Sequence, residues 1–274
     1  MFKIIIMALL IFIGMVGYDN ITDKAQPTTP VQQEQQKVSK HEKSAAMAFF
    51  TSLLPPKEEW PSPVHKFYLA FNMDEVIDPI RQNPNWTSLD AMSRDIPQAL
   101  IAIEDHAFYN HGAIAVEGIL RAALANINAG EVVQGGSTLT QQFVKNVFLS
   151  HEQSMERKIE EAVLSLMLED NYSKDEILEL YLNTTYFGAG STGIKQASKT
   201  YFGKAPSALT LAEASVIASL PYAPTSLNPL ENPDGCKKRQ LLVLAAMHKY
   251  GMINEGQLAE AKAEKIRLTN GTVM

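Results

Sequence analysis

The sequence predicts a mainly α-helical domain, and three kinds of observation support that prediction. From about residue 95 onward, apolar residues recur three and four positions apart, which is the spacing of one helix face. Helix-start signals precede several of these stretches, such as Ser173 with Glu176 three positions later. Glycine or proline ends them, as at Gly203 and Pro221. With 274 residues, 46% of them hydrophobic and 20% charged, the chain can bury one sizeable core, or a core with a smaller lobe.

The overall charge argues against nucleic acid as a partner. The formal net charge is -6 at pH 7, and lysine and arginine form no long block. Proteins bind nucleic acid mainly by neutralising phosphates with such residues, so we expect no nucleic acid partner. The single cysteine, Cys236, cannot form a disulfide within the chain.

Residues 1–18 predict an uncleaved membrane anchor. Beyond Lys3 they carry no charge, and as a helix they would be about 27 Å long, close to the ~30 Å core of a bilayer. A cleaved signal peptide is the alternative, but Met15, rather than a small residue, would stand at the third position before a cut after Gly17. Lys3 before the segment and Asp19 after it place the N-terminus in the cytoplasm and export the rest of the chain.

The rest of the chain is expected to fall into four segments. Residues 19–44, rich in Gln, Pro and Thr, form a polar linker. Residues 45–94 hold several prolines and predict a juxtamembrane or irregular region, with one possible strand at 65–71. Residues 95–253 form the helical domain, and residues 254–274 follow it as a C-terminal tail.

The acidic pair Glu104-Asp105 lies at the end of the first predicted helix. Asp95 is a plausible cap at the start of that helix. Leu100, Glu104 and Phe108 are expected on one face of that helix, while Asp105 is turned about 100° away. A carboxylate on an apolar face is partly desolvated, which raises its pKa and its strength as a proton acceptor. The alternative is a buried acid paired with a Lys or Arg.

Residues 133–146 predict a second site. Two glycines allow a sharp turn, after which Ser137 or Thr138 can cap a helix whose free N–H groups favour an anion. Such a helix could hold a phosphate or a sugar, although a capped surface helix with solvated side chains explains the same pattern. The polar residues expected on its one face are Thr138, Gln141 or Gln142, and Lys145.

Residues 154–170 predict an amphipathic helix with a second carboxylate. Glu161 follows Arg157 by four residues and Lys158 by three, close enough to pair with both. This pattern fits either an ordinary helical ion pair or a second carboxylate in a basic cleft. The expected buried stripe is Ile159, Ala162, Val163, Leu166 and Met167. Further helices are expected within residues 173–204, 209–229 and 237–253, and the last two of these segments are interpreted as scaffold.

Five motifs in this order and spacing resemble the peptidoglycan glycosyltransferases, family 51 of the glycosyltransferases. That family includes monofunctional transglycosylases and the N-terminal domains of class A penicillin-binding proteins. The resemblance runs from about Ile96 to Met252. The motifs are Glu104-Asp105 with Phe108 and His111; GGSTLTQQFVKN; RKIEEAVLSLMLE; KDEILELYLN with YFGK; and LAEASVIASLPYAP.

The resemblance implies a lysozyme-like, two-lobed helical domain behind the membrane anchor, on the outer side of a bacterial inner membrane. The implied reaction polymerises lipid II into β-1,4-linked glycan strands and releases undecaprenyl pyrophosphate. Glu104 matches the family's general base, and Glu161 matches a second glutamate at the donor site. The other matching donor-site positions are Ser137, Gln141, Gln142, Lys145, Asn146, Arg157 and Lys158.

The resemblance also implies the partners. These are lipid II, the growing glycan strand and the membrane, with a separate transpeptidase or other divisome or elongasome proteins. No tightly bound cofactor is expected, although Mg²⁺ or Mn²⁺ could accompany the substrate pyrophosphate. Neither Ser-x-x-Lys nor Lys-Thr-Gly occurs, so we expect no penicillin-binding transpeptidase domain in this chain.

The sequence departs from the family pattern at four positions. Ala113 stands where family members usually have glycine, and Ala115 stands where they usually have Asp or Asn. Gln153 replaces an Arg that contacts pyrophosphate in many members, and the aromatic usual near Thr192 is missing. Loss of one charge-assisted contact weakens binding by ~1.5 to 3 kcal/mol, so we expect activity that is reduced but present.

Three alternatives stay open at this point. A lysozyme-like glycan-cleaving enzyme would also use a glutamate, but it has no need of the STLTQQFVKN helix. A membrane-tethered scaffold without activity is suggested by Gln153 and the two alanines, although both glutamates are retained. Zinc hydrolysis through His106 and His111 is the least favoured, because a spacing of five places the two on different helix faces.

Overall fold

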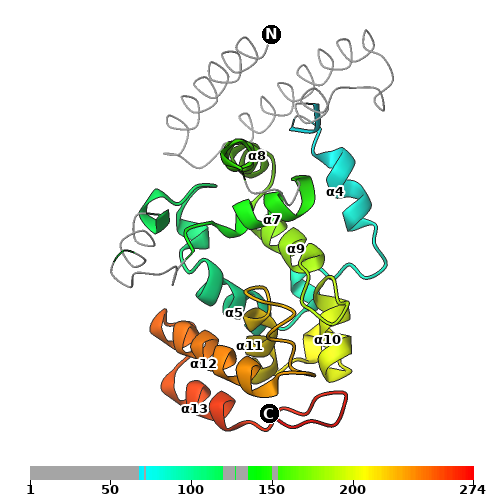
Figure 1. Ribbon diagram of the computed structural model, residues 1–274, viewed down its shortest axis with the longest axis vertical. Helices are drawn as coiled ribbons and strands as arrows, with labels where there is room; N and C mark the ends of the chain where they lie inside the picture. The colour runs from blue at the N-terminus through cyan, green and yellow to red at the C-terminus, as the bar shows by residue number, and fades with distance from the viewer. Residues whose placement is uncertain (1–67, 71, 120–126, 128–134, 150–153) are drawn as a thin grey trace. The chain divides into compact units, whose positions relative to one another are not determined.

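The computed structural model describes residues 68–70, 72–119, 127, 135–149 and 154–274 (Figure 1). The chain divides into two compact units, Met1–Leu69 and Ala70–Met274, and the helices named below belong to the second unit. The predicted anchor, the linker and Gln153 lie outside the described residues. Within the described ranges, no helix is both long enough and apolar enough to cross a membrane.

The regular elements of the described unit are helices, which confirms the predicted mainly α fold. Besides them, two isolated β-bridges join Tyr186 to Thr192 and Arg267 to Val273. Three elements are short 3-10 helices: η2 (Leu89–Ala91), η3 (Phe108–Asn110) and η4 (Pro206–Ala208). The α-helices are α4 (Asp74–Arg81), α5 (Asp95–Glu104), α7 (Leu139–Phe148), α8 (Met155–Asn171), α9 (Lys174–Thr184), α10 (Ile194–Phe202), α11 (Leu211–Ser219), α12 (Pro233–Lys249) and α13 (Glu255–Ala263).

The helices pack as two groups (Figure 1). Helices α5, α11, α12 and α13 pack together in one group, and α7, α8 and α9 pack together in the other. Helix α10 contacts α9 in one group and α11 in the other. One hydrophobic core cluster includes residues of both groups, and the C-terminal end of α5 lies where the two groups meet.

Helix α11 is the centre of the first group because it is buried along almost its whole length, from Ala212 to Ser219. Its alanines and serines are small enough for α5 and α12 to approach closely. The buried hydroxyls of Ser215 and Ser219 donate to backbone carbonyls one turn earlier, at 2.7 Å each. Both of these hydroxyls are thereby paired within the packed interface.

Local helix signals in the sequence are confirmed. The predicted capping box starts α9 at Ser173 with Glu176. The structure shows a second capping box that was not predicted, at the start of α11, formed by Thr210 and Glu213. Gly203 ends α10 with a φ of 67°, in the left-handed region that glycine adopts without strain.

Two predictions before residue 95 were wrong. Residues 68–70 are helical rather than extended, and α4 forms in a region expected to be irregular, with Pro79 inside it. Arg81 at the end of α4 pairs with Glu176 of α9 at 2.9 Å, a tertiary contact that the local sequence does not reveal.

The helix around Glu104 is also shorter than expected. Helix α5 starts at Asp95 with Arg94 as its N-cap, so Asp95 lies in the first turn and is not the cap. The chain leaves the helix at Asp105, whose φ and ψ are -156° and 69°. Phe108 is therefore not on this helix but is buried in η3.

The predicted buried stripe of α8 was wrong as well. Ile159 and Leu166 are 57% and 40% exposed. The buried residues of this helix are Glu161, Leu164, Ser165 and Leu168. The packed face can hold these polar groups because they have partners; Ser165, for example, donates to the Glu161 carbonyl at 2.6 Å.

We expect Gly188→Ala to destabilise the fold more than Gly190→Ala does. Both glycines have positive φ, 86° and 70°, so each alanine incurs about 1 to 2 kcal/mol of backbone strain. A Cβ at residue 188 would also lie 2.3 Å from the Pro224 carbonyl oxygen, whereas a Cβ at residue 190 meets no atom within 4 Å. This clash adds about 1 to 3 kcal/mol. Urea unfolding followed by circular dichroism measures both losses, and equal losses would contradict the close approach.

Candidate active site

Glu104 is the last residue of α5 and faces α7 across the junction of the two helix groups. Its side chain is half-buried, as the apolar surroundings of α5 predicted. The Gln142 amide on α7 donates through Nε2 to Oε2 of Glu104 at 2.9 Å. The hydroxyl of Tyr181 on α9 in turn donates to Oε1 of Gln142 at 2.9 Å. One carboxylate thus connects α5 with α7 and, through Gln142, with α9.

Opposing effects set the pKa of Glu104. Burial is the largest effect and raises the pKa above its ordinary value. The Gln142 hydrogen bond and the positive charges of Arg239 and Lys145 lower it, and the Asp105 charge raises it slightly. The net result is a raised pKa, which makes the ionised carboxylate a better proton acceptor, as the sequence predicted.

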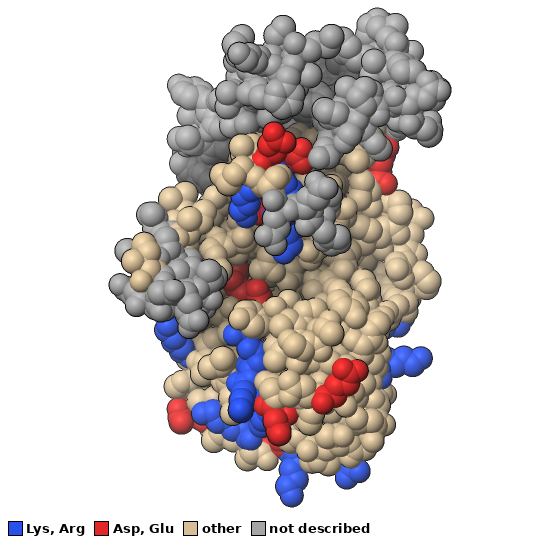
Figure 2. All heavy atoms as spheres, viewed as in Figure 1, with Lys and Arg blue, Asp and Glu red and all other residues tan. Residues whose placement is uncertain are grey.

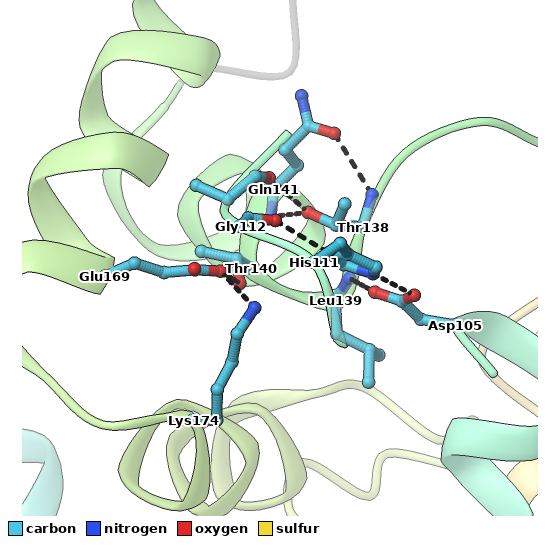
Figure 3. Close-up of polar contacts among 10 residues, drawn as sticks. Asp105, His111, Gly112, Thr138, Leu139, Thr140, Gln141, Glu169 and Lys174 are labelled. Carbon is cyan, nitrogen blue, oxygen red and sulfur yellow. Dashed lines mark hydrogen bonds and ion pairs between the residues drawn. The ribbon is translucent and has the colours of Figure 1, made fainter. Parts of the chain in front are cut away.

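Asp105 joins the end of α5 to the start of α7 (Figure 3). Its Oδ1 lies 2.6 Å from Nε2 of His111, and its Oδ2 accepts from the Leu139 backbone N–H at 3.1 Å. His111 lies 2.6 Å from the Gly112 carbonyl through its other ring nitrogen. The start of α7 was expected to favour an anion, and in the structure the carboxylate of Asp105 provides it. The sequence motifs alone assign Asp105 no such role.

Thr138 is the N-cap of α7. The sequence had left Ser137 and Thr138 as the two candidates for this cap. Its Oγ1 accepts from the Gln141 N–H at 3.1 Å and donates to the Ala113 carbonyl at 2.7 Å. The Gln141 side chain closes the capping box by accepting from the Thr138 N–H at 3.1 Å (Figure 3). Gln141 is buried in this cap, so its Oε1 is engaged by its own helix. Gln142, rather than Gln141, faces Glu104.

A polar cluster ties the second helix group together (Figure 3). Glu169 of α8 accepts from the Thr140 hydroxyl of α7 and from the Lys174 ammonium of α9, at 2.6 Å each. The Lys174 ammonium also lies 4.5 Å from the ring centroid of Phe108 in η3. This cluster fixes the first turn of α7, from which Gln142 projects.

Glu161 forms the second acidic centre on α8. It is 2% exposed and pairs with Lys158 and, at 3.5 Å, with Arg157, so both predicted ion pairs are confirmed. Lys158 also donates to the Ser137 hydroxyl at 3.1 Å, which adds a third predicted donor-site residue to this centre. The Nε of Arg157 is buried and has no hydrogen-bond partner among the described residues. An unpaired buried N–H is a donor available to a ligand oxygen.

The remaining predicted residues lie on α7. Lys145 is exposed and close enough to lower the pKa of Glu104, and Asn146 is exposed beside it. Figure 2 shows this face of the molecule hollowed, with acidic atoms inside the hollow and basic atoms above and below it. Such a distribution suits a neutral or anionic substrate that approaches a carboxylate between cations.

Arg239 is a site residue that the sequence motifs do not reveal, because α12 reads as scaffold. Its guanidinium lies 4.2 Å from the ring centroid of Tyr222, and its positive charge acts on Glu104. Its Nε is buried and unpaired within the described part of the chain. The signal in the sequence was the basic run at residues 237–239 ahead of an apolar stripe.

Among the described residues, the two histidines make separate contacts. His106 stacks on Tyr250, with ring centroids 4.1 Å apart, and His111 pairs with Asp105. In the described ranges, no three His, Cys, Asp or Glu side chains gather to hold a metal ion. Each histidine instead contributes to packing or to the α5–α7 connection.

Comparison with known proteins identifies the family. The family model described as transglycosylase matches residues 73–248. The chain belongs to the transglycosylase family. A protein described as a putative transglycosylase in Cupriavidus necator is 40% identical over 71% of this chain and 84% of its own length. Penicillin-binding protein 1F of Bacillus subtilis is 39% identical over 72% of this chain and 28% of its own length.

This transglycosylase-family chain spans under a third of the penicillin-binding proteins that it matches. Penicillin-binding protein 1A of Aquifex aeolicus is 43% identical, over 64% of this chain and 24% of its own. The crystal structure of penicillin-binding protein 1A from Haemophilus influenzae aligns with 48% of this chain and 16% of its own, at 32% identity and a TM-score of 0.34. The family matched is the one that the sequence motifs indicated.

We expect His111 to stabilise this member of the transglycosylase family in a pH-dependent way. The hydrogen bond with Asp105 is the main cause that raises the pKa of His111. A pKa raised on folding contributes stability that is fully present below the unfolded value of about 6.5 and is lost as the pH rises through the folded value. The difference in free energy of unfolding between the wild type and His111→Gln should be larger at pH 6 than at pH 8.5. Urea unfolding at both pH values measures it, and a pH-independent difference would sink this prediction.

Proposed function

We propose that this protein is a peptidoglycan glycosyltransferase that polymerises lipid II into β-1,4-linked glycan strands and releases undecaprenyl pyrophosphate. The observation that carries the proposal is the half-buried Glu104 carboxylate, on which the positive charges of Lys145 and Arg239 act, in a chain of the transglycosylase family. The relatives described as a transglycosylase and as penicillin-binding proteins support the same activity.

In the proposed reaction, Glu104 acts as the general base. Its carboxylate takes the proton from the 4-hydroxyl of the acceptor sugar as that oxygen attacks the anomeric carbon of the donor. A new carbon–oxygen bond forms, and the bond from the anomeric carbon to the pyrophosphate oxygen breaks. The electron pair leaves with undecaprenyl pyrophosphate, and the proton stays on Glu104. The raised pKa favours this transfer, because a partly dehydrated carboxylate holds a proton more strongly than an exposed one.

The basic residues of α8 suit the departing pyrophosphate. Arg157 and Lys158 lie on one turn with Glu161, which holds both side chains in place. The buried Nε of Arg157, which has no hydrogen-bond partner among the described residues, supplies a donor for a phosphate oxygen. Cations arranged before the reaction stabilise negative charge as it develops on the leaving group. Ser137, Gln141, Gln142, Lys145 and Asn146 stay proposed as donor-site residues, with the Gln141 carbonyl engaged in the α7 cap.

A metal ion held by the protein alone does not fit the residues around Glu161. Both cations that contact Glu161 compete with a metal for its oxygens, and no group of three or more His, Cys, Asp or Glu side chains that could hold a metal is found among the described residues. We therefore derive no step through a metal. A divalent cation that arrives with the substrate pyrophosphate stays a proposal, and polymerisation with and without Mg²⁺ or Mn²⁺ tests it.

The location and partners follow from the proposed substrate. We propose a lysozyme-like domain that is attached to the bacterial inner membrane by residues 1–18 and works on its outer face, where lipid II is presented. The described ranges contain no membrane-spanning helix, and the predicted anchor lies outside them. We also propose a transpeptidase that crosslinks the glycan product as a partner.

We expect Glu104→Gln to abolish polymerisation. Glutamine keeps the shape but accepts no proton, and loss of a general base costs about 100- to 10,000-fold in rate. The measurement is the length and amount of glycan formed from labelled lipid II by the detergent-solubilised full chain. Asp95→Asn, which changes an acid at the other end of α5, is the matched control and should stay active. Long glycan from Glu104→Gln would exclude Glu104 as the base.

The wild type in the same assay separates the remaining functions. Long glycan supports the transferase. Lipid II binding without product favours a scaffold, and shortening of preformed glycan favours a glycan-cleaving enzyme.

We expect Glu161→Gln to lower activity and stability together. The neutral amide leaves Arg157 and Lys158 without their anion, and loss of a buried charged partner costs about 1 to 3 kcal/mol in free energy of unfolding. Donor binding should weaken, which appears as a higher KM for lipid II. Glu156→Gln changes an exposed acid in the first turn of the same helix and should alter neither quantity. Unchanged KM and stability in Glu161→Gln would refute the role given to this ion-pair centre.

A further inference from the structure

We propose that Tyr181 is a positioning residue for the general base: its hydroxyl holds the Gln142 amide in the orientation that directs an N–H donor at Glu104. The inference rests on the proposed function, in which Glu104 is the base. Tyr181 lies on α9, within the KDEILELYLN motif, and it is not one of the residues given a role in the reaction. Its effect on the reaction is transmitted through Gln142.

Two hydrogen bonds of equal length carry the inference. The Tyr181 hydroxyl donates to Oε1 of Gln142 at 2.9 Å, and Nε2 of Gln142 donates to Oε2 of Glu104 at 2.9 Å. Tyr181 is 1% exposed, and its ring is packed in the hydrophobic core. A rigid phenol therefore sets the position of the amide, which in turn sets the position of the carboxylate.

The two ends of the amide make this arrangement directional. Oε1 accepts and Nε2 donates, so the end that faces Tyr181 determines the end that faces Glu104. Burial and the nearby Glu104 charge raise the pKa of Tyr181, which keeps its hydroxyl protonated and able to donate. A turned amide would place Oε1 against the Glu104 carboxylate, where two acceptors repel. The Tyr181 hydroxyl opposes that turn because Oε1 would lose its buried partner.

Substitution of Tyr181 leaves the charged side chains around Glu104 in place. Arg239 acts on Glu104 from α12, Lys145 from α7 and Asp105 from the adjacent position in the chain. The Tyr181 hydroxyl donates to Gln142 and not to any of these three side chains. A shift in the pH dependence on loss of this hydroxyl alone can therefore be assigned to the amide.

The experiment is the pH–rate profile of lipid II polymerisation by Tyr181→Phe in the full chain. A donor hydrogen bond favours the ionised form of Glu104, so a loosened amide raises its pKa. The acid limb of the profile should move to higher pH by about 0.5 to 1 unit, and kcat should fall about three- to tenfold. The KM for lipid II should stay nearly constant, because Tyr181 contacts no substrate. If the acid limb of Tyr181→Phe does not shift and its kcat equals that of the wild type, the inference is wrong.

Tyr201→Phe is the matched control. Tyr201 is also fully buried, and its hydroxyl donates to a backbone carbonyl, that of Phe187, at 2.8 Å. It lies on α10, outside the site, so its loss should lower stability without moving the pH profile. A pH shift of the same size in Tyr201→Phe would show that the effect is general destabilisation and would overturn the inference.

A double substitution tests whether Tyr181 acts through Gln142. Gln142→Ala alone should shift the acid limb in the same direction as Tyr181→Phe, which keeps the test valid if the tyrosine variant folds poorly. Tyr181→Phe should add no further shift in the Gln142→Ala background. An additive shift would refute the transmission through the amide. Failure of the proposed function is distinguishable, since it appears as a wild type without product or as an active Glu104→Gln.

Discussion

The hydrogen bonds of the Asp105 carboxylate are the constraint on which the rest of the site depends. One oxygen holds His111 and the other caps the first N–H of α7 at Leu139, so the end of α5 and the start of α7 are fixed together. Glu104 precedes Asp105, and Gln142 follows Leu139 by three residues. As a consequence, Nε2 of Gln142 lies 2.9 Å from Oε2 of Glu104. A short carboxylate is suited to this task because it accepts from two directions at once. The helix start strengthens the contact, since its dipole favours a negative charge.

The two glutamates of the site differ because their surroundings differ. Glu104 is partly buried and makes no direct ion pair with the described residues, and its pKa is raised by burial. Glu161 is almost fully buried but has two cationic partners on its own helix. A carboxylate paired with Arg157 and Lys158 is a good anchor for these two cations. Two identical side chains thereby take the separate proposed roles of base and organiser of the donor site.

The sequence was a reliable guide to local structure and a poor guide to contacts between helices. Caps such as Thr138 and Ser173 could be predicted because their partners lie three residues away. The packed face of α8 could not be predicted. Glu161 is buried on that face because Arg157 and Lys158 of the same helix pair with it, and the spacing of apolar residues does not reveal this. Arg239 and Tyr181 were missed for the same reason: their effect on Glu104 arises only when distant segments meet.

Adjacent positions in one motif also take different roles because their side chains point in different directions. Gln141 and Gln142 carry the same amide, but a helix turns its side chains by about 100° per residue. Gln141 therefore closes the cap of α7, whereas Gln142 reaches Glu104. The departure at Ala113 leaves the contact there intact, because Thr138 donates to the backbone carbonyl of this residue and not to its side chain. The role of a motif residue is thus set by the direction of its side chain, or by its backbone, as much as by its identity.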